Sequence, residues 1–255
     1  MEIDLDVNFL TCGIEDVFLK CTNLSQLVLM NNQINVSIPE CLAELPLTVL
    51  DLDSNNFSGT IPVSLWNSMT LMEFSAANNF LKGTLSVEIG KAVQLERLVL
   101  SNNQLRGTIP KDIGNLTAIS VLNLNSNLLE GTIPEDLGHS AALTTLDLGN
   151  NQLSGSIPEK LPDLVQLDCL VLSHNKLSGP IPSEPSLYFL TIYCSHFVHL
   201  RSNIINYIVL IFSSSWGTRR KSRKDLKINS DNGQFSMNIF KSDTKCLFFP
   251  DQVHT

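Results

Sequence analysis

The chain has 255 residues, of which 43% are hydrophobic and 16% are charged, and its formal net charge at pH 7 is -8. No nucleic-acid partner is predicted, because the basic hexamer at 219–224 is by itself usually just solvated. The charge is unevenly distributed, because residues 1–182 carry 20 acidic and 8 basic groups, net -12, whereas residues 183–255 carry 5 acidic and 9 basic groups, net +4. We therefore expect a first domain over 1–182 and a chemically different tail over 183–255.

A 24-residue pattern recurs through the first part and is clearest in residues 95–118, LERLVLSNNQLRGTIPKDIGNLTA. Its most regular feature is an asparagine that recurs every 24 residues, with a single interval of 23. The recurring asparagines are Asn8, Asn32, Asn55, Asn79, Asn103, Asn127, Asn151 and Asn175. From Asn32 on, apolar residues stand eight, five and three positions before each asparagine and two positions after it. The spacing of two predicts a short strand with one buried side.

One such unit cannot bury its leucines alone, whereas stacked units form a continuous core, so the pattern predicts a solenoid. We expect each asparagine from Asn32 on to bridge to the next coil, because its amide offers donors as well as an acceptor. Gly107 permits a backbone geometry that side chains resist, and Pro110 fixes φ where the convex side begins.

The pattern LxxLxLxxNxLxGxIPxxLGxL resembles the plant-type leucine-rich repeat of extracellular receptor kinases and polygalacturonase-inhibiting proteins. The segments FLKCTNLSQLVL, LPLTVLDLDSNNFSGTIP, LWNSMTLMEFSAANN and CLVLSHNKLSGPIP resemble a receptor kinase ectodomain in particular. The resemblance covers residues 1–183. It implies a right-handed leucine-rich-repeat solenoid (repeat α/β class) of about eight units, with short parallel strands on the concave face and short 3-10 or helical turns on the convex face.

The first unit begins abruptly, because strand and turn positions are already occupied at Ile3 and Leu10. MEIDLDVNFL lacks the basic and apolar regions of a signal peptide, and the cysteine-paired cap that the resemblance implies is missing. We expect a fragment or a truncated gene product.

Two later units depart from the pattern. Val36 stands where other units have glycine, so its turn should be locally distorted. The unit from Leu71 has Phe74 and Ala76 in place of two leucines, which suggests compensating volumes, and Leu85-Ser86 in place of Ile-Pro.

From residue 183 the repeat is lost. The apolar run 204–212 followed by RRKSRK at 219–224 imitates a membrane span, but it is too short for one, and the basic hexamer is read as a solvated stretch. Cys194, His196 and His199 lack a fourth ligand, so no metal site is predicted. We expect residues from about 190 onward to be poorly ordered and without an evolved function, as a mis-spliced tail would be.

Four glycosylation sequons fit an extracellular parent protein, and none lies in the tail. They begin at Asn23, Asn35, Asn56 and Asn115. Cys12, Cys21 and Cys41 fall in neighbouring units and could pair, although buried free thiols are the preferred interpretation.

Catalytic motifs are missing from the sequence: it has no Gly-rich nucleotide loop, no kinase signature and neither GxSxG nor HExxH. We therefore predict no catalytic residue, no cofactor and no enzymatic activity for this chain. By resemblance, a longer parent protein would be a serine/threonine receptor kinase.

The predicted function is recognition. The resemblance implies an ectodomain fragment on the extracellular face of the plasma membrane, binding a secreted peptide or small protein and a co-receptor leucine-rich-repeat kinase. A secreted inhibitor of a cell-wall hydrolase is the alternative, and its missing caps count against it.

The strand phase places outward residues six, four, two and one positions before each asparagine, where stacking makes columns of them. Acidic groups gather toward the N-terminal strands. The predicted ligand-binding residues are Asp51, Asp53, Glu73, Arg97, Asn123 and Asp147. A basic partner is expected to contact the first three, because a face of one sign attracts the opposite sign, although an acidic face can also serve solubility alone. His174 also lies at a concave position, where such a histidine is more often merely exposed.

Overall fold

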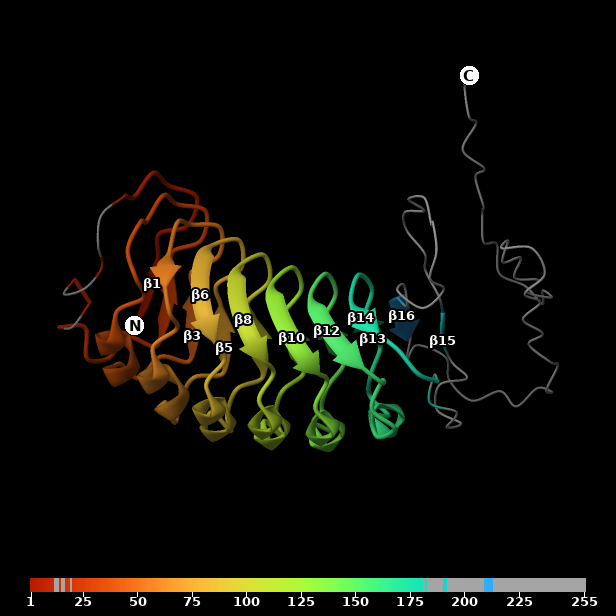
Figure 1. Ribbon diagram of the computed structural model, residues 1–255. Coiled ribbons are helices and arrows are strands. Elements are labelled where there is room, and N and C mark those ends of the chain that lie inside the picture. The colour runs from red at the N-terminus through yellow and green to blue at the C-terminus, as the bar shows by residue number, and fades with distance from the viewer. Residues whose placement is uncertain are drawn as a thin grey trace, which may run out of the picture. The chain divides into compact units, whose positions relative to one another are not determined.

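The structure, a computed structural model, describes residues 1–11, 14, 17–18, 20–180 and 182, together with the backbone of 190–191 and 209–212. Contacts divide the chain into a unit of Met1–Trp216 and a unit of Gly217–Thr255. Every described residue belongs to the first unit, where successive coils stack side by side (Figure 1). Within this described part, no helix is long and apolar enough to cross a membrane.

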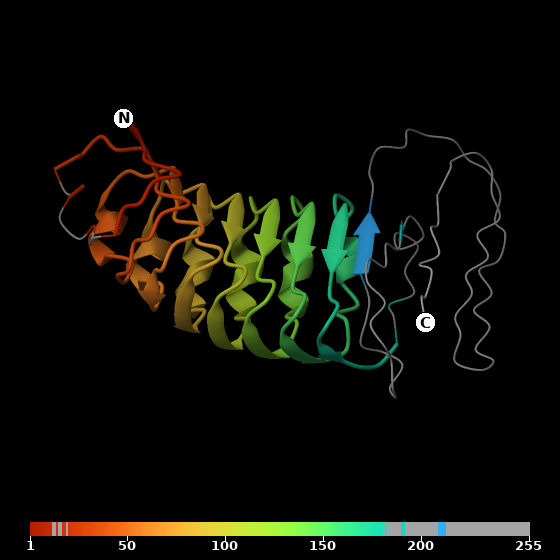
Figure 2. The same cartoon turned by 90° about the horizontal axis from the view of Figure 1, so that it is seen from above.

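The main sheet contains the strands that the asparagine phase predicts, one in each coil and all parallel, in agreement with the expected architecture. These strands are β1 (Glu2–Asp4), β2 (Gln26–Val28), β3 (Val49–Asp51), β5 (Glu73–Ser75), β7 (Arg97–Val99), β9 (Val121–Asn123), β11 (Thr145–Asp147) and β13 (Cys169–Val171). Figure 2 shows them in order along the stack. Two further strands continue the sheet antiparallel, β16 (Val209–Phe212) beside β13 and β15 (Leu190–Thr191) beside β16.

A second parallel sheet was not predicted, and it replaces what the sequence suggested was only a turn after each asparagine. It consists of β4 (Ser58–Gly59), β6 (Phe80–Thr84), β8 (Gln104–Thr108), β10 (Leu128–Thr132), β12 (Gln152–Gly155) and β14 (Lys176–Leu177). In β8, Gln104 and Arg106 are exposed while Leu105 between them is fully buried. This alternation is strand periodicity, but three residues are too few to distinguish it from a turn in sequence. We call this the side sheet.

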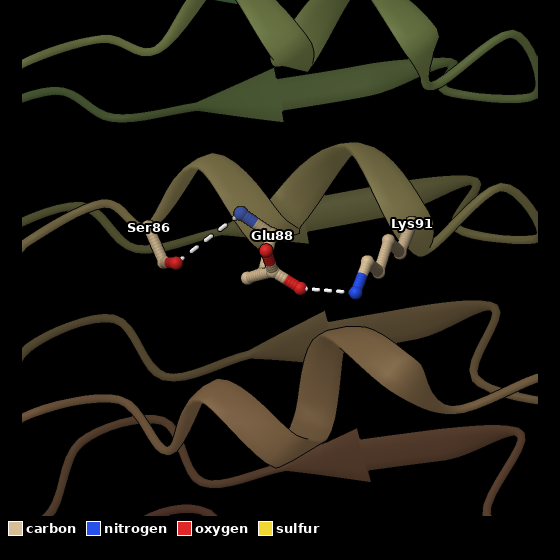
Figure 3. A network of polar contacts seen from close by, with 3 residues as sticks. All are labelled: Ser86, Glu88 and Lys91. Atoms are coloured by element: carbon tan, nitrogen blue, oxygen red, sulfur yellow. Dashed lines mark hydrogen bonds and ion pairs between the residues drawn. The ribbon is translucent and has the colours of Figure 1, made fainter.

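Short 3-10 helices occupy the convex side, as predicted. They are η1 (Glu40–Glu44), η2 (Val63–Asn67), η3 (Val87–Lys91), η4 (Lys111–Asn115), η5 (Glu135–His139) and η6 (Leu161–Asp163). Proline precedes η1, η2, η4 and η5. In η3, Ser86 takes that place, and its Oγ accepts a hydrogen bond from the Glu88 N–H at 3.2 Å, while Lys91 pairs with the Glu88 carboxylate (Figure 3). A side-chain cap thus replaces the fixed φ of proline.

The core runs through the stack as one cluster of the inward residues. In residues 95–118, where the repeat is clearest, Leu95, Leu98, Leu100 and Leu105 are all fully buried. The irregular unit buries Phe74 and Ala76 just as completely. The Phe74 ring meets the Trp66 ring edge to face, with centroids 6.0 Å apart. This irregular unit therefore buries a pair of aromatic rings in the core, in a unit that has a small alanine in place of a leucine.

The asparagine side chains bridge coils, but toward the preceding coil rather than the next one. Asn103 Nδ2 donates to Ala76 O of the preceding coil at 2.9 Å and to Leu100 O of its own coil at 3.2 Å. Its Oδ1 accepts from the Leu81 N–H of the preceding coil at 2.9 Å. The same acceptor bond is made by Asn32, Asn55, Asn79, Asn127, Asn151 and Asn175. Each amide thereby supplies partners to backbone groups just after the main strand and at the start of the side strand.

The glycine at the end of the side strand adopts the left-handed region in each coil where it occurs, for example Gly107 with φ +73°. A Cβ there would lie 2.9 Å from the Thr84 Cγ2 of the preceding coil, so the site also lacks space for one. Val36, at the equivalent position, does not have a positive φ. Its coil contributes only an isolated bridge, Ser37 to Ser58, in place of a side strand. The turn is therefore distorted there, as its sequence predicts.

Several sequence predictions fall outside the described residues. These are the pairing of Cys12, the cluster of Cys194, His196 and His199, and the basic hexamer at 219–224. Cys21 has a free thiol and is half-buried. The domain boundary at 182 and the character of the tail stay predictions, and the backbone strands β15 and β16 are the part of the tail that the structure describes.

Candidate ligand-binding face

The exposed side of the main sheet, which we call the concave face, carries the predicted columns of outward side chains. Strand register aligns Val49 with Glu73 and Glu73 with Arg97, and in the next column it aligns Asp51 with Ser75. Further along, Asn123 is aligned with Asp147. Neighbouring strands lie about 4.8 Å apart, so each column is a row of closely spaced side chains.

Three carboxylates gather where β3 and β5 meet. Glu73 and Arg97 are exposed, whereas Asp51 and Asp53 are half-buried. The Asp53 carboxylate is already hydrogen-bonded within the protein, because its Oδ1 accepts hydrogen bonds from Ser75 Oγ and from the Ala77 N–H, both at 2.6 Å. Glu73 is thus the carboxylate most open to a partner, and Asp53 has a structural role that its sequence position did not reveal.

Burial raises the pKa of Asp51 above its ordinary value, and the negative charges of Asp53 and Glu73 raise it further. The hydrogen bond from the Asp53 N–H, at 3.0 Å, and the positive charge of Arg97 lower the same pKa, but they do not outweigh burial. A positive group placed beside these carboxylates would relieve this unfavourable charging.

The remaining predicted residues, Asn123 and Asp147, lie on the same face, but their side chains are hydrogen-bonded to the backbone. Asn123 and Asp147 are half-buried. Their Oδ1 atoms accept from the N–H two residues on, those of Asn125 and Gly149, both at 3.0 Å. The Asn125 amide also donates to Asp147 Oδ1 at 3.0 Å. The C-terminal part of the face is therefore pre-arranged as a polar network.

The column one position before each asparagine was predicted to point outward, but its backbone conformation was not predicted. The residue before each recurring asparagine has a positive φ of 49° to 57°. These residues are Val7, Asn31, Ser54, Asn78, Asn102, Ser126, Asn150 and His174. Asparagine tolerates this left-handed region best among residues with a Cβ, so the repeated Asn-Asn pairs could have indicated it. Exposed Asn102 Nδ2 donates to Asn78 Oδ1 at 2.9 Å, which extends an ordered polar edge beside the concave face.

Comparison with protein families decides what this array is. Residues 93–153 match the family model described as "Leucine rich repeat", and residues 46–68 and 166–188 match a second model of the same description. The array is a leucine-rich-repeat solenoid. Its fold matches that of solved plant leucine-rich-repeat ectodomains.

Two curated relatives come from Oryza sativa subsp. japonica. The leucine-rich-repeat array is 48% identical over 69 residues to "Leucine-rich repeat receptor protein kinase MSL1" and 48% identical over 63 residues to "Leucine-rich repeat receptor protein kinase MSP1". These matches cover 27% and 25% of this chain and 5% of each relative. The chain therefore matches only a small share of the curated relatives' length.

Similar solved structures include plant receptors in complex with their partners. The receptor RGFR1 in complex with RGF2 has a TM-score of 0.67 and 31% identity, over 69% of this chain and 28% of that one. The Arabidopsis receptor kinase HAESA, in complex with the peptide hormone IDA and the co-receptor SERK1, has a TM-score of 0.61 and 34% identity. The match covers 71% of this chain and 34% of the HAESA chain. The GASSHO1/SCHENGEN3 ectodomain from Arabidopsis thaliana, in complex with CASPARIAN STRIP INTEGRITY FACTOR 2, has a TM-score of 0.66 and 34% identity. The match covers 71% of this chain and 25% of that ectodomain.

Proposed function

We propose that this leucine-rich-repeat solenoid is a ligand-recognition module from the extracellular part of a plant receptor kinase. Its ligand is a secreted peptide or small protein, bound on the concave face. The observation that carries the proposal is the register of the main sheet, which turns isolated side chains into continuous columns. The similarity to receptors solved with peptide hormones supports the same function.

The partner is proposed to be basic at the end that meets β3 and β5. Glu73 is exposed and Asp51 is half-buried beside it, with an unfavourably charged carboxylate. Bringing a lysine or arginine there would supply opposite charge where the protein itself supplies little. A co-receptor with leucine-rich repeats is a further proposed partner, by analogy with the HAESA complex.

Catalysis is not part of the proposed role. Among the described residues, no group of three or more His, Cys, Asp or Glu side chains could hold a metal ion. The similarities reported for this chain concern its repeats. Kinase activity, in this proposal, belongs to other parts of the relatives.

A peptide-binding measurement tests the proposal. Synthetic peptides that differ only in their number of lysines and arginines would be titrated against the chain at low and at high salt. We expect tighter binding of the basic peptides, weakening as salt rises. Glu73→Gln together with Asp51→Asn should weaken that binding at least several-fold, whereas Glu135→Gln, an equally exposed change on η5, should not. Asn at 51 keeps an acceptor for the Asp53 N–H, as Asn123 does in its own coil.

Equal binding of acidic and basic peptides, or equal binding by the two variants, would refute the basic partner. Either result would mean that the acidic face serves only to keep the protein soluble.

A further inference from the structure

Two of the four sequons, 21 residues apart in sequence, lie side by side on the side sheet. Asn35-Val-Ser37 and Asn56-Phe-Ser58 run parallel, with Asn56 N–H donating to Ile34 O and Ser58 N–H donating to Val36 O, both at 2.9 Å. A bridge pairs Ser37 with Ser58. The two sequon asparagines are therefore neighbours on one face.

The amide of Asn56 is chemically available, in contrast to that of the residue before it. Asn55 Nδ2 donates to three backbone carbonyls, and its Oδ1 accepts from the Ile34 N–H. Asn56, within the described part of the chain, is half-buried and has no side-chain hydrogen bond. Its neighbours Phe57 and Leu81 point into the core, so Asn56 and Ser58 point outward.

An exposed aromatic ring stands next to this sequon. Phe80, the first residue of β6, is paired in register with Ser58, and its side chain is 52% exposed. Residues opposite one another in a sheet share a face, and residues two apart in an extended chain point to the same side. Asn56 lies two residues before Ser58, so it points to the same side as Ser58 and Phe80. At the equivalent position of later coils the side sheet carries Gln104, Leu128, Gln152 and Lys176. Leu128 is half-buried, so Phe80 is the exposed apolar side chain among these positions.

We propose that Asn56 carries an N-linked glycan whose innermost N-acetylglucosamine packs on the ring of Phe80. This inference rests on the proposed extracellular location. In the reaction, Asn56 Nδ2 forms a bond to C1 of the sugar and loses a proton, and the bond from C1 to a lipid-linked diphosphate donor breaks, releasing that diphosphate. The C–H face of the sugar then covers the negative face of the aromatic ring and removes apolar surface from water.

This arrangement is consistent with ligand binding on the concave face. Asn35 and Asn56 follow the recurring asparagine, and Asn115 ends η4, so each lies off the concave columns. A glycan on Asn56 would screen the N-terminal part of the side sheet and leave Glu73 and Arg97 accessible. The side sheet near Phe80 would then not be a protein-docking surface.

The test uses the full chain secreted from plant cells behind a cleavable leader. Glycopeptide mass spectrometry reports whether Asn56 is modified, and thermal melts compare four proteins: unchanged, Asn56→Gln, Phe80→Ser and the double variant. In the presence of Phe80, we expect loss of the glycan through Asn56→Gln to lower Tm by about 2–4 °C. With Ser at 80, the same loss should lower Tm by less than about 1 °C. Val165→Ser, which changes a side chain that is 76% exposed and remote from every sequon, is the control and should keep the full effect of Asn56→Gln.

The proposal is overturned if Asn56 is unmodified in the secreted chain, or if Asn56→Gln lowers Tm equally with and without Phe80. Neither result bears on peptide binding, which is measured separately on Glu73 and Asp51.

Discussion

Single residues on the concave face have to be judged by what their own backbone already requires of them. Asp53 is the clearest case, because its carboxylate is occupied by Ser75 and Ala77 of the following coil. Glu73 has no such commitment in the described structure and is exposed. A carboxylate that stabilises the fold and one that is open to a ligand look the same in sequence, and only the neighbouring coil distinguishes them.

The raised pKa of Asp51 leads to a stability prediction. Because its folded pKa lies above the ordinary value of 3.8, the folded chain binds this proton more tightly than the unfolded chain. Stability contributed by Asp51 therefore falls as pH rises from 3.8 through the folded pKa, and the penalty persists at neutral pH. Asp51→Asn should raise Tm at neutral pH, and this gain should fade as pH drops below 3.8 and vanish once Asp51 of the unchanged protein is protonated in the unfolded as well as the folded state. Melts across that range would measure it, and a gain that is constant with pH would rule out burial of the charge as the cause.

Gly107→Ala tests the turn at the end of the side strand. A left-handed φ costs an alanine about 1–2 kcal/mol relative to glycine. The new Cβ also meets Thr84 Cγ2 at 2.9 Å, so the free energy of unfolding should fall by more than that. Thr84→Ser removes the methyl group, and in that background Gly107→Ala should cost only the conformational share. An identical cost in both backgrounds, measured by denaturant unfolding, would mean that the Thr84 methyl group does not matter.

At the scale of the element, the sheets are tied together by the asparagines. Asn127 donates to Leu100 O and Leu124 O, and its Oδ1 accepts from the Leu105 N–H at 3.0 Å. Leu100 O and Leu124 O each accept from a second amide, that of Asn103 and that of Asn151, so of these three groups only the Leu105 N–H loses its partner. Asn127→Ala should therefore cost about 1–3 kcal/mol. Asn8 bonds only to its own exposed coil, so Asn8→Ala should cost less than about 1 kcal/mol. Comparable losses for the two variants would show that the bonds to the preceding coil contribute little.

The inward face of the main strands supports a second comparison. Leu122 in β9 is fully buried, so Leu122→Ala should lower the free energy of unfolding by about 2–5 kcal/mol through lost burial and a cavity. Asn123 is half-buried, and its Oδ1 accepts from the Asn125 N–H, so Asn123→Ala should cost about 0.5–1.5 kcal/mol. Urea unfolding of both variants measures the difference, and equal costs would contradict the assignment of inward and outward sides.

At the scale of the whole array, the period of 24 residues was enough to predict short stacked strands and the buried leucines. The resemblance to plant-type leucine-rich repeats added the parallel main sheet and the 3-10 turns. The side sheet, the left-handed residue before each asparagine and the adjacency of Asn35 and Asn56 were not predicted. The side sheet and the adjacency of the two sequon asparagines depend on contacts between residues of different coils, whereas the left-handed position is a local feature that the repeated Asn-Asn pairs could have indicated. The strand register sets how far each coil is shifted, so that partners in the side sheet are 22 residues apart and not 24, as Lys82 and Gln104 are. That shift follows from stacking geometry and leaves no trace in a single repeat.

The proposed binding face predicts a pattern of solvent protection along the array. A ligand on the concave columns should shield Glu73 on β5 but not Glu130 on the side sheet or Glu135 on η5, all three of which are exposed in the free chain. The three residues belong to the same solenoid and differ mainly in the side on which they lie.

Carboxyl footprinting with a carbodiimide and an amine label, read by mass spectrometry with and without the tightest-binding basic peptide, measures this directly. The concave-face account predicts that labelling of Glu73 falls several-fold while labelling of Glu130 and Glu135 is unchanged. Protection of Glu130 or Glu135 with Glu73 still fully labelled would contradict it.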